Sequence, residues 1–288
     1  MADTLRLAIQ KSGRLFDGTH ALLKECDIEF SASKTALKAK AYDFPVEFYF
    51  LRDDDIPTYV ADGVADAGIV GLNALKESGA EVTIAEPLGF GRCRLSLAVP
   101  KGMDAAYKDV GSLAGKRIAT SHARILREYL KTNGVGAHIH EVSGSVEIAP
   151  SIGLAEAVCD LVSSGSTLAS NGLVEVETVL ESEAVLITRK NLPGGQQKIL
   201  DQLIFRARAV RKARHNKYIM LNAPNAAIEK IISLIPGAKS PSVLPLATKG
   251  WSSVHSVVSD HDFWEVIGSL KAAGAEGILV LPIEKMIA

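Results

Sequence analysis

The chain has 288 residues, a formal net charge of −1 and three cysteines. A chain of this length can hold about two or three domains, and its apolar and charged fractions are those of a soluble globular protein. So small a net charge excludes the bulk basic field of a typical nucleic-acid-binding protein. The cysteines lie far apart, which argues against a disulfide framework or a zinc site and favours a reducing cytoplasm. We expect neither a signal peptide nor a membrane span.

Short apolar runs alternate with helical patterns in the N-terminal part of the chain. The predicted strands are 5–9, 46–51 and 67–70, and the predicted helices are 16–24 and 73–77. Asp54 or Asp55 is expected to cap a further helix, which has Pro57 in its first turn. Strands that alternate with helices indicate a layered α/β fold.

The same alternation continues through the middle of the chain. The predicted strands are 95–99, 116–120, 138–142, 158–162 and 185–188, and the predicted helices are 121–130, 152–157 and 195–214. Ser121 is expected to cap the first of these helices. The last one ends in basic residues, which suit the negative end of a helix dipole.

The C-terminal segment reads as a small domain of its own. Its predicted elements are a strand at 218–221, a helix at 226–234, a hairpin of 243–246 with 253–258, a helix at 263–273 and a strand at 277–281. The order βαββαβ is that of the ferredoxin-like split unit. About 70–75 residues are enough for such a domain.

Residues 160–168, with the sequence DLVSSGSTL, have the composition of a phosphate-binding loop. Gly165 permits a positive φ and a close approach of the backbone to an anion. Successive N–H groups, and a helix that begins near Ser166, would attract a phosphate. Asp160 suits sugar hydroxyls, because an ionised carboxylate only accepts hydrogen bonds. One phosphate beside one acid favours a phosphorylated sugar. The hydroxyl side chains are those of Ser163, Ser164, Ser166 and Thr167.

Composition alone leaves two other interpretations of this loop open. Ser, Thr and Gly clusters also form ordinary turns that cap helices. Ser164 as a nucleophile would need a positioned base, and the loop is not a Gly-x-Ser-x-Gly elbow. The loop also lacks the lysine of a Walker loop and the spaced glycines of a dinucleotide site.

Residues 147–168, EIAPSIGLAEAVCDLVSSGSTL, resemble the signature of the ATP phosphoribosyltransferases of histidine biosynthesis. The segment has a glutamate, a glycine six residues later, a small residue two further on, then Asp-Leu and Ser-Gly-x-Thr-Leu. The resemblance covers essentially the whole chain and indicates the long form with a C-terminal regulatory domain. Supporting segments are AIQKSGR, RDDDIP, DAGIVG, CRLS and, in the tail, GILVLPIEKM.

The resemblance implies a fold and a domain order. The catalytic half would be α/β and two-lobed, like a type II periplasmic binding protein, with its active site in the cleft. Lobe I would comprise residues 1–94 and 184–214, and lobe II residues 95–183. Residues 215–288 would form a ferredoxin-like, ACT-like domain that binds histidine as a feedback inhibitor. Members of this form assemble as dimers and hexamers.

The resemblance also implies the reaction. Adenine N1 of ATP would attack C1 of phosphoribosyl pyrophosphate, giving phosphoribosyl-ATP and pyrophosphate. Mg²⁺ would be held mainly by the substrate, and no covalent nucleophile is needed. We expect positioning, the exclusion of water and stabilisation of the leaving group to supply most of the rate.

Residues at matching positions receive roles from the resemblance. The expected catalytic residues are Lys11, Arg14, Arg52 and Asp160. The expected ligands of phosphoribosyl pyrophosphate are Glu147, Asp160, Ser163, Ser164, Gly165, Ser166 and Thr167. The expected ATP contacts are Lys11, Arg14, Arg52, Asp53 and Arg92, and those of histidine are Asn222 and Ser242. Competing interpretations are solvated cations for the basic residues, a helix cap for Glu147 and a polar solvent-facing hairpin for the tail.

Two other functions have to be weighed. A two-lobed solute sensor would not need the full sugar-phosphate loop. A phosphoribosyltransferase that acts on a free base usually has two adjacent acids before the loop, whereas Cys159 occupies the first of those positions here. We expect His20, His122, His138 and His140 to be surface or packing residues.

Overall fold

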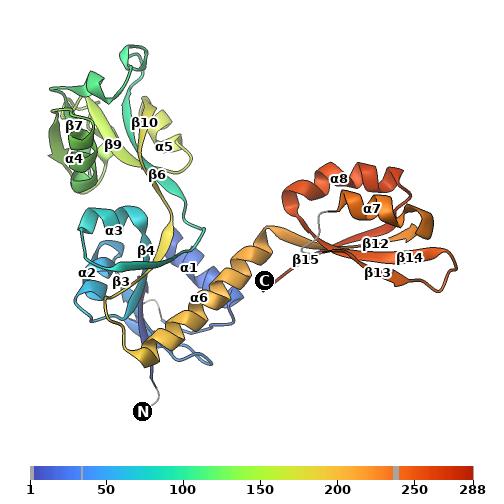
Figure 1. The fold of residues 1–288 in the computed structure, drawn as a ribbon. Helices are drawn as coiled ribbons and strands as arrows, with labels where there is room; N and C mark the ends of the chain where they lie inside the picture. Colours follow the sequence, from blue (N-terminus) through green and yellow to red (C-terminus); the bar gives the residue numbers. More distant parts are fainter. Residues whose placement is uncertain (1–2, 34, 236–239, 288) are drawn as a thin grey trace. The chain divides into compact units, whose positions relative to one another are not determined.

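The structure, a computed structural model, describes residues 3–33, 35–235 and 240–287 (Figure 1). It divides into two compact units, Met1–Gln202 and Leu203–Ala288. The boundary lies inside helix α6 (Gly194–Arg214), whereas the sequence prediction placed it at the end of that helix. In the described part of the chain the first unit contains two β-sheets and the second contains one.

The first sheet, with its helices, forms lobe I. Its strand order is β2-β3-β1-β4-β11-β5, and β1 (Leu5–Gln10) pairs in parallel with β3 (Val46–Leu51) and β4 (Ala67–Gly71). Parallel strands end at one edge of a sheet, where ligands usually bind. Residues 11–14, 52–55 and 71–73 therefore meet there. The other elements are β2 (Lys38–Lys40), β5 (Thr83–Pro87), β11 (Ala184–Thr188), α1 (Arg14–Glu25), the 3-10 turn η1 (Asp53–Asp55), α2 (Ile56–Ala61) and α3 (Leu72–Ser78).

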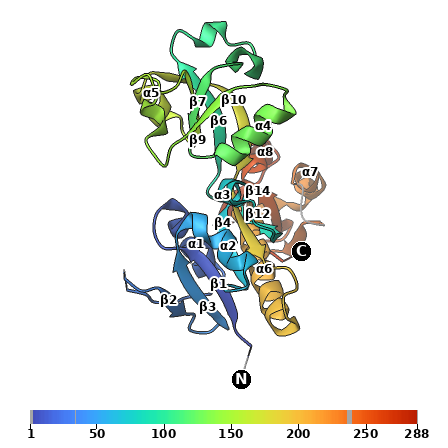
Figure 2. The ribbon, with the colours of Figure 1, turned by 90° about the vertical axis from the view of Figure 1, so that its left-hand side faces the viewer.

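The second sheet, with its helices, forms lobe II (Figure 2). Its strand order is β10-β6-β9-β7-β8. Apolar side chains of β6, including Leu95 and Leu97, pack with Ile118 of β7 and Leu126 of α4 in a buried core. The elements are β6 (Cys93–Pro100), η2 (Asp104–Ala106), η3 (Val110–Leu113), β7 (Arg117–Thr120), α4 (Ala123–Thr132), β8 (His138–Glu141), η4 (Val146–Ile148), β9 (Ala157–Val162), α5 (Ser166–Ser170) and β10 (Leu173–Ser182).

Two short segments join the lobes. The chain leaves β5 at Pro87 and enters β6 at Cys93, and it returns through Glu183 between β10 and β11. So few covalent connections leave the relative placement of the lobes to non-covalent contacts across the cleft.

The C-terminal domain has the predicted βαββαβ order. All its strand pairs are antiparallel, in the order β13-β14-β12-β15. Ile219, Leu221 and Val254 project from the sheet into a core shared with Ile231 of α7 and Leu270 of α8. The elements are β12 (Asn216–Pro224), η5 (Asn225–Ala227), α7 (Ile228–Leu234), β13 (Ser242–Pro245), β14 (Trp251–Ser259), α8 (Asp260–Ala272) and β15 (Glu276–Pro282).

Three local predictions were wrong. Residues 152–157 contain turns and the start of β9 in place of a helix, because Gly153 adopts a positive φ of 74°. The Asp55 side chain makes no capping hydrogen bond to α2, and none comes from Asp54, which lies inside η1. Ser121 does not cap α4, which begins after His122.

One long strand was not predicted at all. In strand β10 (Leu173–Ser182) the apolar residues alternate with Glu175 and Glu177, but register shifts at 175–177 and 178–180 interrupt this period of two. Both carboxylates have partners that only the fold supplies. Glu175 accepts hydrogen bonds from Arg94, and Glu177 accepts them from Tyr107 and Tyr129.

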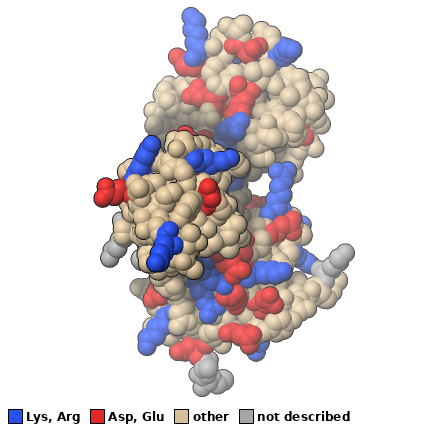
Figure 3. Space-filling model, turned by 90° about the vertical axis from the view of Figure 1, so that its right-hand side faces the viewer, with Lys and Arg blue, Asp and Glu red and all other residues tan. Residues whose placement is uncertain are grey.

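The fold class is confirmed as α/β with a separate C-terminal sheet domain. None of the described helices has the length and apolarity needed to cross a membrane. On the face shown in Figure 3, basic and acidic side chains are interspersed, in keeping with a net charge of −1.

Candidate active site

The loop after β9 has the geometry of an anion-binding turn. Gly165 adopts φ +80°, which a side chain would strain, and α5 begins at the next residue. Val162 and Leu168 are buried and hold the two ends of the loop. The hydroxyl-bearing residues between them are exposed, and Ser164 and Ser166 share a hydrogen bond with 3.0 Å between their Oγ atoms. The loop therefore presents hydroxyls and backbone N–H groups on a fixed base.

This loop lines a cavity of about 440 Å³, and residues of both lobes form its walls. Lobe I contributes the ends of β1, β4 and the start of α1, as the meeting of parallel strand ends requires. Sequence reasoning did not name Gln10, Gly71 or Asn73 for a site. The lining residues are Gln10, Arg14, Leu15, Asp53, Gly71, Asn73, Gly91, Arg92, Cys93 and 161–168.

Arg14 is the predicted cation that reaches the loop. Its Nη1 donates to Ser163 Oγ across the cleft at 3.1 Å. Arg92 lines the same cavity, where its charge adds to that of Arg14. Arg94, two residues on, is instead paired with Glu175 on the neighbouring strand. The loop thus faces two guanidinium groups, which are well suited to phosphate oxygens.

Asp160 and Glu147 are the acids beside the loop. Asp160 lies on β9 and Glu147 in η4, and the two elements pack together. Burial raises the pKa of Asp160, a hydrogen bond from the Leu161 N–H opposes this, and the charge of Glu147 adds to the rise. Both side chains are half-buried. Hydroxyl groups of a ligand that donate hydrogen bonds to both carboxylates would reduce the repulsion between them.

Asp53, an expected ATP contact, lines the loop cavity in an unusual environment. Burial, together with the neighbouring Asp54, raises its pKa to about 6, although the Gly71 N–H donates to its carboxylate. Its Oδ1 is buried and makes no hydrogen bond in the described structure. The carboxylate therefore titrates closer to neutrality than an ordinary aspartate.

The structure separates the other two predicted cations from the loop cavity. Lys11 lines a neighbouring cavity of about 460 Å³ with the aromatic rings of Phe16 and Phe50. Arg52 is exposed just before η1 and is not among the residues that line the loop cavity. The β1–α1 turn lies between the two cavities, because Lys11 and Gly13 line one and Arg14 the other.

His122 and Glu77 are further polar residues at the cleft that sequence reasoning did not assign to it. His122, expected on the surface or in packing, is buried, and its Nε2 lies 3.1 Å from Asn73 Nδ2 in lobe I. Glu77 accepts hydrogen bonds from backbone groups of lobe II. No local pattern marks these residues, because each partner lies 47 to 49 residues away in the sequence.

Comparison with known proteins identifies the family. A family model described as ATP phosphoribosyltransferase matches residues 52–209, and one described as the HisG C-terminal domain matches residues 213–285. An ATP phosphoribosyltransferase of Cytophaga hutchinsonii is 58% identical over 287 residues, covering 100% of both chains. One from Bacteroides thetaiotaomicron is 54% identical, covering 98% of this chain and 99% of its own.

The chain belongs to the ATP phosphoribosyltransferase family. It is an enzyme of histidine biosynthesis in the long form, with the C-terminal domain. A solved structure, an ATP phosphoribosyl transferase (HisG:HisZ) complex from Thermotoga maritima, is also similar, with a TM-score of 0.59 and 26% identity. It covers 71% of this chain and 99% of that one. The sequence-based identification of the family is therefore confirmed.

The C-terminal domain of this ATP phosphoribosyltransferase carries the two predicted histidine contacts on one face. Asn222 of β12 pairs with Ser253 of β14, and Ser242 of β13 pairs with His255 of the same strand. Residues paired across antiparallel strands project to the same side. This side is opposite the buried core residues Ile219 and Leu221. The sheet thus gathers polar groups on its open face.

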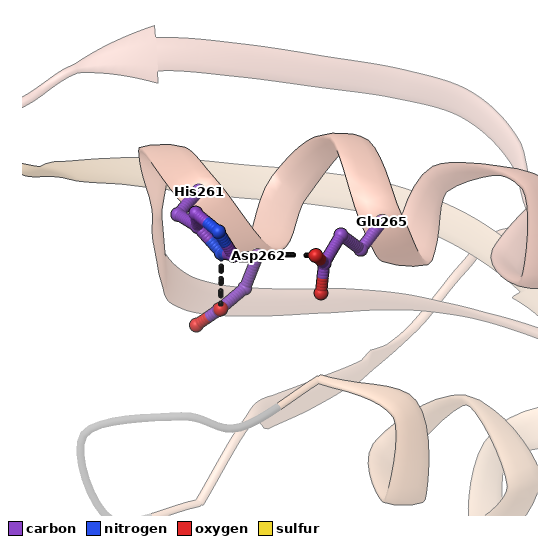
Figure 4. Close-up of side chains that lie close together, drawn as sticks. All are labelled: His261, Asp262 and Glu265. Atoms are coloured by element: carbon purple, nitrogen blue, oxygen red, sulfur yellow. Dashed lines mark hydrogen bonds and ion pairs between the residues drawn. The ribbon is translucent and has the colours of Figure 1, made fainter.

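A second polar group in this domain has the residue types of a metal site. His261, Asp262 and Glu265 have potential ligand atoms within 4.8 Å of one another in the first turns of α8 (Figure 4). They come from one helix, and His261 and Glu265 are exposed. Ser259 is the N-cap residue of α8, and its Oγ accepts a hydrogen bond from the Asp262 N–H. The cluster is accounted for by solvated ion pairs at a helix start.

Proposed function

We propose that the enzyme transfers the 5-phosphoribosyl group of phosphoribosyl pyrophosphate to N1 of the adenine of ATP. The N1 lone pair forms a bond to C1 of the ribose as the bond from C1 to the pyrophosphate oxygen breaks, and pyrophosphate leaves with that electron pair. The observation that carries the proposal is the single cavity in which the loop of lobe II faces Arg14 and Arg92 of lobe I.

Each side chain has a role that its chemistry supports. Residues 163–167 hold the 5′-phosphate, and Asp160 and Glu147 accept hydrogen bonds from the ribose hydroxyls. Arg14 and Arg92 contact the pyrophosphate, whose growing charge is the main feature to stabilise in the transition state. Asp53 orients the nucleotide within the same cavity. Lys11 and Arg52 extend the cationic edge of lobe I towards the triphosphate.

Mg²⁺ accompanies the pyrophosphate in this proposal. Among the described residues, the ligand groups that converge in threes lie on α8 and not around the cavity. Arginines that can bind phosphates, together with carboxylates that do not gather in threes, fit a cation that enters on substrate phosphates, as Mg²⁺ commonly does. When bound, Mg²⁺ supplies charge neutralisation of the leaving group.

The reaction is tested by mixing the enzyme with ATP, phosphoribosyl pyrophosphate and Mg²⁺. We expect release of one pyrophosphate for each phosphoribosyl-ATP, with the product identified by mass spectrometry as substituted at N1. Omitting either substrate is the control. Folded protein that releases no pyrophosphate under these conditions would contradict the proposal.

Arg14→Gln is expected to lower kcat/KM for phosphoribosyl pyrophosphate by about 10- to 100-fold. The reason is that a hydrogen bond between charged groups contributes about 1.5–3 kcal/mol. Steady-state kinetics at constant ionic strength would measure the loss. Lys24→Gln is the matched control, because Lys24 is exposed in the last turn of the same helix. Equal activity of both variants would remove Arg14 from the site.

Histidine inhibition is the regulatory part of the proposal. Histidine would bind at the open face of the C-terminal sheet in the assembled homo-oligomer and shift the lobes between conformations. Couplings of this kind are typically about 1–3 kcal/mol. The support is the gathering of Asn222 and Ser242 on that face, with His255 between them.

Asn222→Ala is expected to raise the histidine concentration needed for half-inhibition by about fivefold or more, because it removes about one net hydrogen bond. Its kcat without histidine should not change. Inhibition curves for the variant, the wild type and Ser233→Ala would test this. Ser233 is exposed in the same domain and bonds to the Lys230 carbonyl of its own helix. An unaltered inhibition curve for Asn222→Ala would exclude this contact.

A further inference from the structure

Polar contacts between residues of lobe I and lobe II hold the two lobes in a fixed relative position. In the proposed reaction lobe II holds the sugar phosphate, and lobe I supplies most of the nucleotide-binding groups. The distance between N1 and C1 therefore depends on the placement of one lobe against the other. An error of about 1 Å in such a placement is enough to cost about 100-fold in rate.

Asn73 and His122 form one of these contacts. Asn73 belongs to α3 in lobe I and lines the loop cavity, and His122 precedes α4 in lobe II. The distance from Asn73 Nδ2 to His122 Nε2 is 3.1 Å, and both residues are 8% exposed. Ser182 fixes the amide, because its Oγ accepts from the Asn73 N–H at 3.0 Å and donates to Asn73 Oδ1 at 2.9 Å.

This arrangement requires a neutral imidazole. With Oδ1 occupied as an acceptor, Nδ2 of Asn73 is the donor towards His122, and Nε2 must accept. The ring proton then lies on Nδ1, 3.0 Å from Ser121 Oγ. A protonated ring would place two donors against each other in a buried position.

Glu77 makes the second contact from the same helix of lobe I. Its carboxylate accepts from the backbone N–H groups of Arg124 at 2.9 Å and Ile125 at 3.0 Å. These groups belong to the first turn of α4, which has no capping hydrogen bond from the side chain of its own N-cap. Helix α4 is thus capped by the opposite lobe, and separating the lobes would leave its amides to water.

We propose that Asn73, His122 and Glu77 are positioning residues that hold the two lobes at the separation required for transfer. His122 makes this interlobe bridge only when its ring is neutral, so that acid opens the cleft and slows the reaction. The kinetic part rests on the proposed function, whereas the bridge itself does not.

The charges around His122 set the range of pH in which the bridge should open. Burial lowers the pKa of His122 below its ordinary 6.5, and three carboxylates oppose this shift. They are Glu77 on α3, Asp160 on β9 and Asp54 in η1, while Arg124 is the first cation in the sequence of α4. Because the folded protein holds the ring neutral, the bridge is complete above pH 6.5 and is lost as the pH falls through the lowered value.

Hydrogen exchange resolved to single amides would test the bridge without any substrate. In the wild type the Arg124 and Ile125 amides should be protected, and protection corrected for the intrinsic rate should fall on acidification below pH 6.5. In His122→Phe, which keeps an aromatic ring but has no hydrogen-bond acceptor, these two amides should exchange at least tenfold faster than in the wild type at pH 7.5. In His122→Gln, whose amide oxygen accepts without titrating, protection should be restored and independent of pH between 5 and 6.5. His138→Phe is the control, because His138 is an exposed residue of β8.

Kinetics would test the positioning role. His122→Phe should lower kcat at least tenfold while the Kd for ribose 5-phosphate stays within twofold, because the groups proposed to hold the sugar and its 5′-phosphate all belong to lobe II. Glu77→Ala provides the same kcat test should His122→Phe fail to fold. Unchanged protection in His122→Phe, or full kcat in folded variants of both sites, would overturn the proposal. A wild type without turnover would contradict the proposed function alone and leave the exchange result to decide on the bridge.

Discussion

Asp160→Asn is expected to lower kcat/KM for phosphoribosyl pyrophosphate by about 100-fold. The substitution keeps the size of the side chain but removes the charge at the end of β9, where the carboxylate is half-buried beside Glu147. A charge-assisted hydrogen bond contributes about 1.5–3 kcal/mol, and the proposed transition state has positive charge on the ribose that a carboxylate also stabilises. Together these effects amount to about 3 kcal/mol, which is a factor of about 100.

Steady-state kinetics with varied phosphoribosyl pyrophosphate would measure this loss. Asp104→Asn is a suitable control, because Asp104 lies in an exposed turn of the same lobe, where Oδ1 accepts from the Gly102 N–H. Burial raises the pKa of Asp160, so wild-type activity should decline in mild acid as the carboxylate takes up a proton. The residual activity of Asp160→Asn should lack that component. A variant with full kcat/KM would show that the ribose hydroxyls are bound elsewhere.

Asp66→Ala is expected to destabilise lobe I by about 3–5 kcal/mol. Asp66 is 1% exposed just before β4 and accepts hydrogen bonds from the Arg6 N–H at 3.0 Å, Arg6 Nε at 2.9 Å and Arg189 Nε at 3.2 Å. Asp66 is buried, whereas the Arg6 and Arg189 side chains are 36% and 23% exposed, so the loss consists mainly of several hydrogen bonds between charged groups, each contributing about 1.5–3 kcal/mol. The network also joins β1 to the segment after β11, so its loss affects the strand that leads into the turn before Arg14.

Urea unfolding would measure this effect, with circular dichroism following the whole chain. Tryptophan fluorescence is an internal control, because Trp251 and Trp264 both lie in the C-terminal domain. We expect the part of the circular dichroism signal that reports unfolding of lobe I to move to lower urea concentration. The fluorescence transition of the C-terminal domain should change little. Glu81→Ala, which removes an exposed pair with Lys190, should leave both transitions in place. A lobe I transition that stays in place in Asp66→Ala would contradict the structural role of the network.

The difference in unfolding free energy between the wild type and Asp66→Ala should depend on pH. Burial by itself would raise the pKa of Asp66, but hydrogen bonds from Arg6 and Arg189 outweigh it and hold the pKa below the ordinary 3.8. The ionised carboxylate therefore stabilises the fold at and above about pH 4. This contribution is lost as the pH falls through the lowered pKa, so the gap between wild type and Asp66→Ala should shrink in acid.

Local sequence patterns predicted the family, the α/β class and the phosphate loop. The loop could be found because its hydroxyl groups, its acid and its glycine lie within nine consecutive residues. The positive φ of Gly165 could also be predicted from these neighbouring residues alone. The βαββαβ tail was predictable because each element has its own apolar periodicity and turn residues. The missed strand β10 shows the limit of such patterns, since two register shifts interrupt its alternation and its glutamates find their partners in other elements.

The sequence by itself therefore determined most of the elements and the family, and it predicted which loop is suited to phosphate binding. Only the tertiary structure decided which side chains meet. It brought Arg14 to Ser163 while leaving Lys11 in a neighbouring cavity, and it joined His122 to Asn73 across the cleft. The physical reason is range: turn and helix signals act over a few residues, whereas these contacts join residues that only the packing of two lobes brings together.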